Sequence, residues 1–228
     1  MNRSRTIVLS LSLVAAFAFT AAAQDAPPAE NPPQAPHGYV LIPEDAWTAF
    51  DNQPEQAFEK ARDAFNDHDF DASAQAIRQS AVFVEVEASR ATTKGQQPLM
   101  QCVRDLNQLA DSVEKGHVTT VNELNKTFSR THYALAKHHY QLAADAWQNE
   151  GSAAANHDFK AAAQNLKWGL KWTGKKVSAA TDKTISGADN LADRIKSGGK
   201  WAAQEMGEGL KNLGGAIQSA ADRMQSNQ

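Results

Sequence analysis

Apolar side chains recur at steps of three and four residues along most of the chain, which is the spacing of one helix face. Stretches of this kind, bounded by capping residues, proline or glycine, predict helices over residues 43–66, 69–93, 98–115, 119–149 and 158–172. The stretch 119–149 is the clearest, because Leu124, Phe128, Leu135 and His138 lie on one heptad seam. The chain is therefore predicted to be all-α.

Two short features interrupt the helical pattern. Pro54 lies inside the stretch 43–66 and is expected to bend or split that helix, because proline lacks a backbone N–H donor. The apolar run 39–42 is compatible with a brief strand or with a hydrophobic segment that docks on the first helix. We favour the docking segment, since no partner strand is evident elsewhere in the sequence.

An internal similarity relates residues 68–78 to residues 157–167. Both segments begin with His-Asp-Phe and continue with alanines and a shared glutamine. We expect Asp69 and Asp158 to cap the helices that follow, because an aspartate accepts hydrogen bonds from the free N–H groups of a first turn. The predicted architecture is a helical bundle of two helix-turn-helix hairpins with a bridging helix, 98–115, and an amphipathic C-terminal tail.

The amino-terminal residues have the features of a bacterial-type export signal. Arg3 and Arg5 precede an apolar run over 7–19, and residues 21–23 are alanines of the kind that a signal peptidase accepts. The run is too short for a membrane-spanning helix. These features predict a periplasmic protein with a signal peptide over 1–23, a proline-rich leader over 24–38, a helical bundle over 39–173 and a Gly/Ala-rich amphipathic tail over 174–228.

The single cysteine and the distribution of charge refine this picture. An exported chain whose only cysteine is Cys102 has no internal disulfide, and the neighbours Val103 and Leu106 indicate a small buried side chain. Residues 24–118 hold 16 acidic and 7 basic side chains, whereas residues 160–200 hold 9 basic and 3 acidic ones. This asymmetry favours a contact between the two parts or attraction of the basic part to an anionic surface.

The end of the last predicted helix and the tail have the pattern of an interfacial segment, with lysines and tryptophans each recurring every fourth residue. Glycines weaken the tail as an isolated helix by ~1 kcal/mol each relative to alanine, so it should fold only against the bundle, a partner or lipid. The alternative is an ordinary core helix with a solvated lysine face. The predicted surface for a protein partner or an anionic membrane consists of Lys167, Trp168, Lys171, Trp172, Lys175, Trp201, Leu210, Leu213 and Ile217.

Three histidines of the stretch 119–149 form a candidate metal-binding set: His132, His138 and His139. With Glu85 or Glu87 nearby, their imidazoles could hold zinc, copper or nickel, or ligate haem. Residues seven positions apart are separated by about 10 Å along a helix, so His139 with a residue from another helix is favoured over a pair with His132. The alternative is that His138 is a buried, hydrogen-bonded group that fixes helix register.

No sequence motif indicates an enzyme. The sequence contains no phosphate-binding loop, no dinucleotide-binding fingerprint, and no Cys-x-x-Cys, Gly-x-Ser-x-Gly or His-Glu-x-x-His motif. We therefore predict no catalysis and no cofactor. The predicted compartment and the acidic mature chain disfavour nucleic acid as a partner, and no transmembrane helix is expected after signal cleavage.

The segment 57–65, followed by residues 69–72, resembles the periplasmic YfdX family. The similarity consists of an Ala-Arg-x-Ala helix, a turn and an alanine-rich second helix, and residues 135–170 are similar in outline. The resemblance implies an exported helical protein without known catalytic residues and with a binding or stress-related role. The predicted function is thus non-enzymatic, in envelope interaction or stress response through the basic tail, with metal or haem binding as the alternative.

Overall fold

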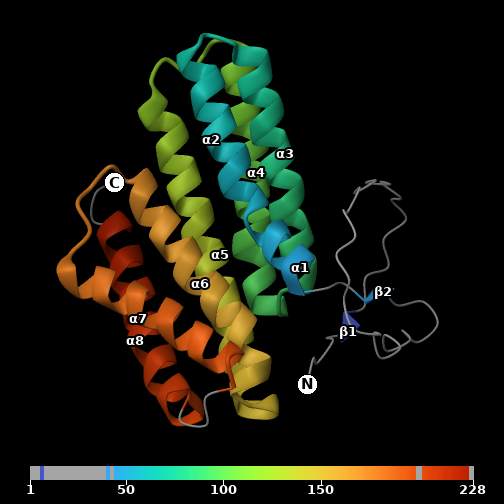
Figure 1. Ribbon diagram of the computed structural model, residues 1–228. Helices are drawn as coiled ribbons and strands as arrows, with labels where there is room; N and C mark the ends of the chain where they lie inside the picture. Colours follow the sequence, from blue (N-terminus) through green and yellow to red (C-terminus); the bar gives the residue numbers. More distant parts are fainter. Residues whose placement is uncertain (1–5, 8–39, 42–43, 199–201, 226–228) are drawn as a thin grey trace, which may run out of the picture. The chain divides into compact units, whose positions relative to one another are not determined.

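The computed structural model of the protein describes residues 6–7, 40–41, 44–198 and 202–225 (Figure 1). The chain divides into two compact units, residues 1–50 and 51–228, and each is described by itself. Most of the predicted signal peptide, the leader 24–38 and Trp201 lie outside the described residues.

The first unit contains a short antiparallel pair of strands. Strand β1 (Thr6–Ile7) pairs with β2 (Val40–Leu41), with Thr6 opposite Leu41. The favoured interpretation of residues 39–42 as a docking segment is therefore wrong, because β-branched partners for a strand are present at residues 6–7.

Helices make up nearly all of the rest, which confirms the all-α class. Helix α1 (Glu44–Asp51) begins in the first unit and ends at the first residue of the second. The second unit continues with α2 (Gln53–Asn66), α3 (Phe70–Arg90), α4 (Thr93–Glu114), α5 (Val121–Glu150), α6 (Ser152–Trp172), α7 (Ala179–Lys196) and α8 (Ala202–Gln225). None of the helices in the described ranges is both long and apolar enough to cross a bilayer.

The helices of the second unit form two groups that share α5. Helices α2, α3, α4 and α5 contact one another in a ring, so α3 and α5 lie diagonally across it. Helices α5, α6, α7 and α8 form the second group, in which α5 and α6 lie side by side over most of their length (Figure 1). Each group has its own apolar core; Phe58 stacks on Phe128 in the first, and Phe159 and Leu213 are fully buried in the second.

Several predicted boundaries are confirmed by the local chemistry. The helix predicted over 43–66 is split as expected, since α1 ends at Asp51 and Pro54 lies in the first turn of α2. Asp69 caps α3, because its Oδ1 accepts a hydrogen bond from Ala72 N at 3.0 Å. Cys102 is buried, as predicted.

Two predicted helix starts are wrong. Helix α4 begins at Thr93, because the Thr92 side chain caps it, and Pro98 is accommodated inside the helix. Helix α6 begins at Ser152, immediately after Gly151, whose φ of 92° already makes the turn. Asp158 is therefore a buried residue within α6 and caps nothing, so the second copy of the internal similarity is not a helix start.

The predicted tail folds as α7 and α8 against α5 and α6, in the same compact unit as the bundle. Three glycines of α8 lie at this contact. A Cβ at Gly207, Gly209 or Gly214 would lie within 3.0 Å of Trp147, Phe159 or Tyr140, respectively. The glycines that weaken α8 as an isolated helix thus allow close approach to aromatic side chains of α5 and α6.

Candidate metal centre

Helix α5 carries three buried histidines, and each forms a hydrogen bond with a carboxylate from another helix. His132 contacts Glu55 of α2, His138 contacts Glu87 of α3, and His139 contacts Asp158 of α6. Buried polar groups of this kind destabilise a protein unless they are paired, so the three bonds are part of what holds α5 in register.

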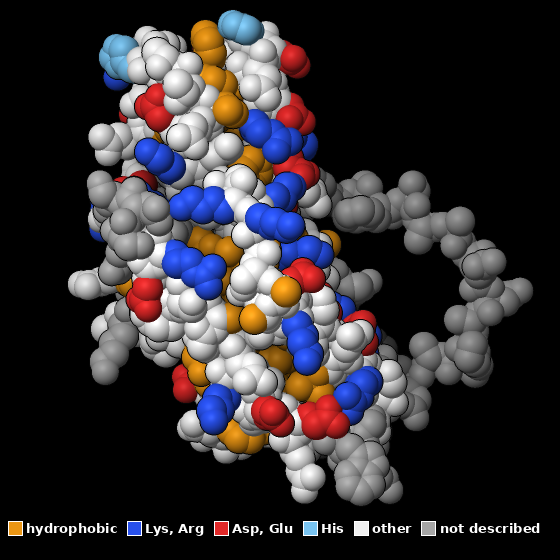
Figure 2. Space-filling view, turned by 90° about the vertical axis from the view of Figure 1, so that its left-hand side faces the viewer, with side chains coloured by type: hydrophobic (Ala, Val, Ile, Leu, Met, Phe, Trp, Pro, Cys, Tyr) orange, Lys and Arg blue, Asp and Glu red, His pale blue; other side chains and the backbone are white. Residues whose placement is uncertain are grey.

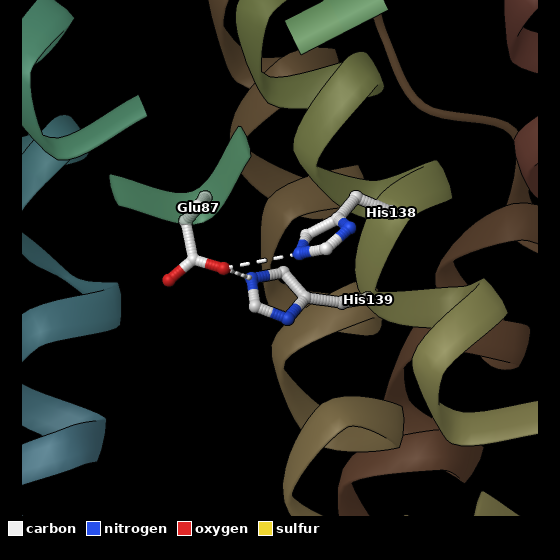
Figure 3. A group of neighbouring side chains, drawn as sticks. All are labelled: Glu87, His138 and His139. Atoms are coloured by element: carbon white, nitrogen blue, oxygen red, sulfur yellow. Dashed lines mark hydrogen bonds and ion pairs between the residues drawn. The ribbon is translucent and has the colours of Figure 1, made fainter. Parts of the chain in front are cut away.

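Glu87, His138 and His139 converge on one point, and one donor atom from each lies within 4.8 Å of the other two (Figure 3). Glu87 Oε2 is 3.1 Å from His138 Nε2 and 3.9 Å from His139 Nε2. All three side chains are at least 97% buried. Glu87 reaches the histidines from α3, across the diagonal of the first helix group, so the triad joins two helices that are not ring neighbours.

Asp158 holds the imidazole of His139 from the side opposite Glu87. Its Oδ1 is 3.0 Å from His139 Nδ1, which leaves Nε2 facing Glu87. A carboxylate on the far nitrogen is the arrangement that orients histidines in metal sites, since it fixes the tautomer and the ring plane.

The charges of this cluster are strongly coupled. Burial raises the pKa of Glu87, but the hydrogen bond from His138 and the charges of His139 and Arg90 lower it to about 2. Burial also raises the pKa of Asp158, which His139 lowers to about 2. Burial lowers the pKa of His139, yet its bond to Asp158 and the charge of Glu87 raise it to about 9. The pKa of His138 is lowered, chiefly by burial. The two carboxylates that flank His139 therefore favour its protonated form.

Arg90 completes the surroundings of Glu87. Its Nη1 lies 3.1 Å from Oε1 and 3.0 Å from Oε2 of the carboxylate, so it donates to both oxygens. The guanidinium orients the carboxylate, and it is also a positive charge that a bound cation would have to tolerate nearby.

His132 belongs to a separate and fully occupied network. Its Nε2 is 3.0 Å from Glu55 Oε2 and its Nδ1 is 2.9 Å from Asn165 Oδ1. Glu55 also accepts hydrogen bonds from Lys171 and from Trp172 Nε1. Because three side chains already share the carboxylate of Glu55, and His132 also bonds to the amide of Asn165, this network ties α2, α5 and α6 together and offers no converging third donor among the described residues.

The two networks are related by a shift of seven residues along both α5 and α6. Moving seven residues forward along α5, from His132 to His139, corresponds to moving seven back along the antiparallel α6, from Asn165 to Asp158. The equivalent position of α6 thus holds a neutral amide, Asn165, in one network and a carboxylate, Asp158, in the other. Only the second network has an additional histidine, His138, and only it resembles a metal site.

Of the predicted metal set, the structure brings His138 and His139 together beside Glu87, whereas His132 lies in the other network. Of the two candidate glutamates, Glu87 joins the histidines and Glu85 is exposed. Asp158 is absent from the predicted set, because its place in the His-Asp-Phe segment predicts a helix cap. Its spacing from the buried Ala155 and Ala162 of α6 is the signal that it lies on an inward face.

The predicted partner surface is largely wrong, because most of its apolar members are in the core. Trp172 is buried and donates to Glu55, Trp168 is half-buried beside His132, and the side chains of Leu210, Leu213 and Ile217 are buried in the second core. The apolar stripe of α8 therefore packs on the protein itself. Lys167, Lys171 and Lys175 are exposed.

Charge is nevertheless unevenly spread over the surface. Figure 2 shows Lys and Arg side chains gathered across the middle of one face, with acidic side chains mainly toward its margins. Without the tryptophans and leucines beside them, the exposed lysines lack the apolar half of an interfacial helix.

Comparisons with protein-family models, with curated proteins and with solved structures give no match for this chain. The resemblance to the YfdX family stays a prediction.

Proposed function

We propose that this protein is a non-catalytic metal-binding helical bundle that holds one divalent transition-metal ion between Glu87, His138 and His139. The observation that carries the proposal is the convergence of two imidazoles and a carboxylate from two helices, with donor atoms within 4.8 Å of one another.

The spacing of these donors is close to that of an occupied site. Zinc bonds of about 2.0–2.2 Å in tetrahedral geometry place neighbouring donor atoms about 3.3 Å apart. The carboxylate oxygen of Glu87 lies 3.1 Å and 3.9 Å from the two imidazole nitrogens. The two imidazole nitrogens lie within 4.8 Å of each other, so side-chain rotations that draw the three donors together would bring them into contact with one ion.

The chemistry of the donors favours zinc, copper or nickel over calcium or magnesium, because imidazole nitrogen is a borderline ligand and the harder cations prefer oxygen. It also disfavours haem. Donor atoms this close together, on side chains that are almost fully buried, leave no space among them for a macrocycle.

A metal ion would compete with protons and with Arg90. The imidazolium of His139 must lose its proton, and His138 must present an unprotonated nitrogen, before either binds metal. Binding therefore releases protons, and affinity falls as the pH is lowered. The buried position supports storage, sensing or a structural role, because a substrate could not reach an ion there.

The compartment in this proposal comes from the amino-terminal sequence. Within the periplasm, a protein that takes up a transition metal would serve the predicted role in envelope stress. That role no longer depends on a membrane-bound tail, and no residue of the tail is required for it.

The test is a calorimetric titration of chelator-treated protein with zinc, copper and nickel. H138Q removes one ligand of the triad, and H132Q is its matched control, since both histidines are buried in α5 and both bond to a buried glutamate. We expect wild-type protein and H132Q to bind one of the metals and H138Q to bind it at least tenfold more weakly.

Circular dichroism establishes that both variants are folded. Equal affinity in H138Q and wild-type protein, or no heat with any of the three metals, would show that the triad is a structural network only.

A further inference from the structure

Asp51 and His157 form a second pair of buried ligand-type groups next to the triad. Asp51 ends α1, and His157 lies in α6 directly before Asp158. Asp51 Oδ2 is 2.8 Å from His157 Nε2, and the two side chains are 4% and 12% exposed. The pair thus connects the start of the second unit with the helix that orients His139.

The hydrogen bonding of this pair is incomplete. The two nearest atoms are close but not aligned for a hydrogen bond, so His157 Nε2 has no hydrogen-bond partner among the described residues. The other carboxylate oxygen, Asp51 Oδ1, is likewise buried without one. A buried polar atom in this state costs about 1–3 kcal/mol, and more when it carries charge, so such atoms commonly bind water or an ion.

Both atoms can donate a lone pair to a cation. A carboxylate oxygen and an imidazole nitrogen 2.8 Å apart, without an aligned proton between them, are about 0.5 Å closer than two donor atoms on one tetrahedral zinc ion, so a small movement apart would let both bind the same ion. The imidazole is also more exposed than any side chain of the triad, so water could fill the remaining coordination positions.

The pair lies within electrostatic reach of the triad. The charge of Asp51 contributes to the raised pKa of His139, and the charge of His157 contributes to the lowered pKa of Asp158. The three carboxylates Glu87, Asp158 and Asp51 all act on His139, so a cation held by Asp51 and His157 would also be attracted by Asp158 and Glu87 nearby.

We propose that Asp51 and His157 form an outer site for a second divalent transition-metal ion, adjacent to the inner site of Glu87, His138 and His139. The outer site has fewer protein ligands and greater exposure. It therefore binds more weakly, exchanges faster, and is the position that an ion from solvent occupies first. This inference extends the proposed function but depends on different residues, so each can fail without the other.

The test counts zinc ions per chain. Chelator-treated protein is titrated with zinc chloride in a calorimeter, and bound zinc is measured by atomic absorption after equilibrium dialysis. D51N and H157Q each remove one outer ligand with little change of shape, H138Q removes an inner one, and H117Q replaces an exposed histidine as the control.

We expect two zinc ions of unequal affinity in wild-type protein and in H117Q. D51N and H157Q should lose the weaker ion and keep the tighter one, whereas H138Q should weaken the tighter ion. A single ion in wild-type protein that D51N and H157Q leave unchanged overturns the outer site alone. Two ions that H138Q leaves unchanged overturn the inner site alone, and no bound zinc overturns both.

Discussion

Gly209 of α8 is the position at which one added methyl group tests the docking of the tail most sharply. A Cβ at this position would lie 2.9 Å from both Leu191 Cδ2 and Phe159 Cζ. Those side chains are 5% and 0% exposed. Because buried side chains are close-packed, the contact can be relieved only by shifting α8 or by moving the two side chains into their neighbours.

Gly215 is the matched control, since it lies in the same helix, is exposed, and has no atom within 4 Å of its Cβ position. G215A should stabilise the protein by ~1 kcal/mol, which is the helix-propensity difference between glycine and alanine. G209A gains the same propensity but also overpacks the core, at a cost of about 1–3 kcal/mol. We therefore expect G209A to be about 1–3 kcal/mol less stable than G215A.

Urea unfolding followed by far-ultraviolet circular dichroism measures both free energies of unfolding, with the wild-type protein as reference. The unfolding midpoints can be compared directly only if the free energy of unfolding has the same dependence on urea concentration in both variants. If G209A is as stable as G215A, α8 does not pack on α6 and α7, and its apolar stripe is again available to a partner or a membrane.

Three further predictions concern other parts of the second unit. The pKa of Glu55 is lowered from 4.5 to about 2, so the stability that its ionised form provides is complete above pH 4.5 and is lost as the pH falls toward 2. The stability of E55Q should not change with pH in this range. If E55Q unfolds at the same acid midpoint as the wild-type protein, ionised Glu55 does not stabilise the fold. D69A should lower the free energy of unfolding in urea by ~1 kcal/mol because α3 loses its cap, whereas no change would mean that Asp69 does not cap the helix. Burial raises the pKa of the Cys102 thiol to about 11, so a thiol reagent should modify it only after unfolding, and rapid modification of the folded protein would refute its burial.

The helices could be predicted from sequence because their signals are local. Apolar spacing, the cap at Asp69 and the break near Pro54 each depend on residues a few positions apart. The start of α6 could not be predicted in the same way. Asp158 has the same neighbours as Asp69, and only the turn at Gly151 and the position of His139 decide that it is a buried ion-pair partner.

The packing of the tail and the membership of the metal-ligand triad both depend on contacts between residues that are far apart in the sequence. Gly209 fits Phe159, fifty positions earlier, and nothing in the local sequence distinguishes it from the unpacked Gly215. Glu87 meets the histidines of α5 across a diagonal of the first helix group. From the sequence alone, Glu85 and Glu87 are both possible partners of the histidines. The packing of α3 against the other helices of the first group decides that Glu87 is the one that contacts them.

The measurement that tests the central claim most directly is an anomalous difference map from crystals soaked in zinc, recorded on both sides of the zinc absorption edge. The account predicts a peak about 2.0–2.2 Å from the carboxylate of Glu87 and from one imidazole nitrogen each of His138 and His139. A map in which zinc binds only at exposed side chains, with Glu87 still bonded to His138, would contradict it.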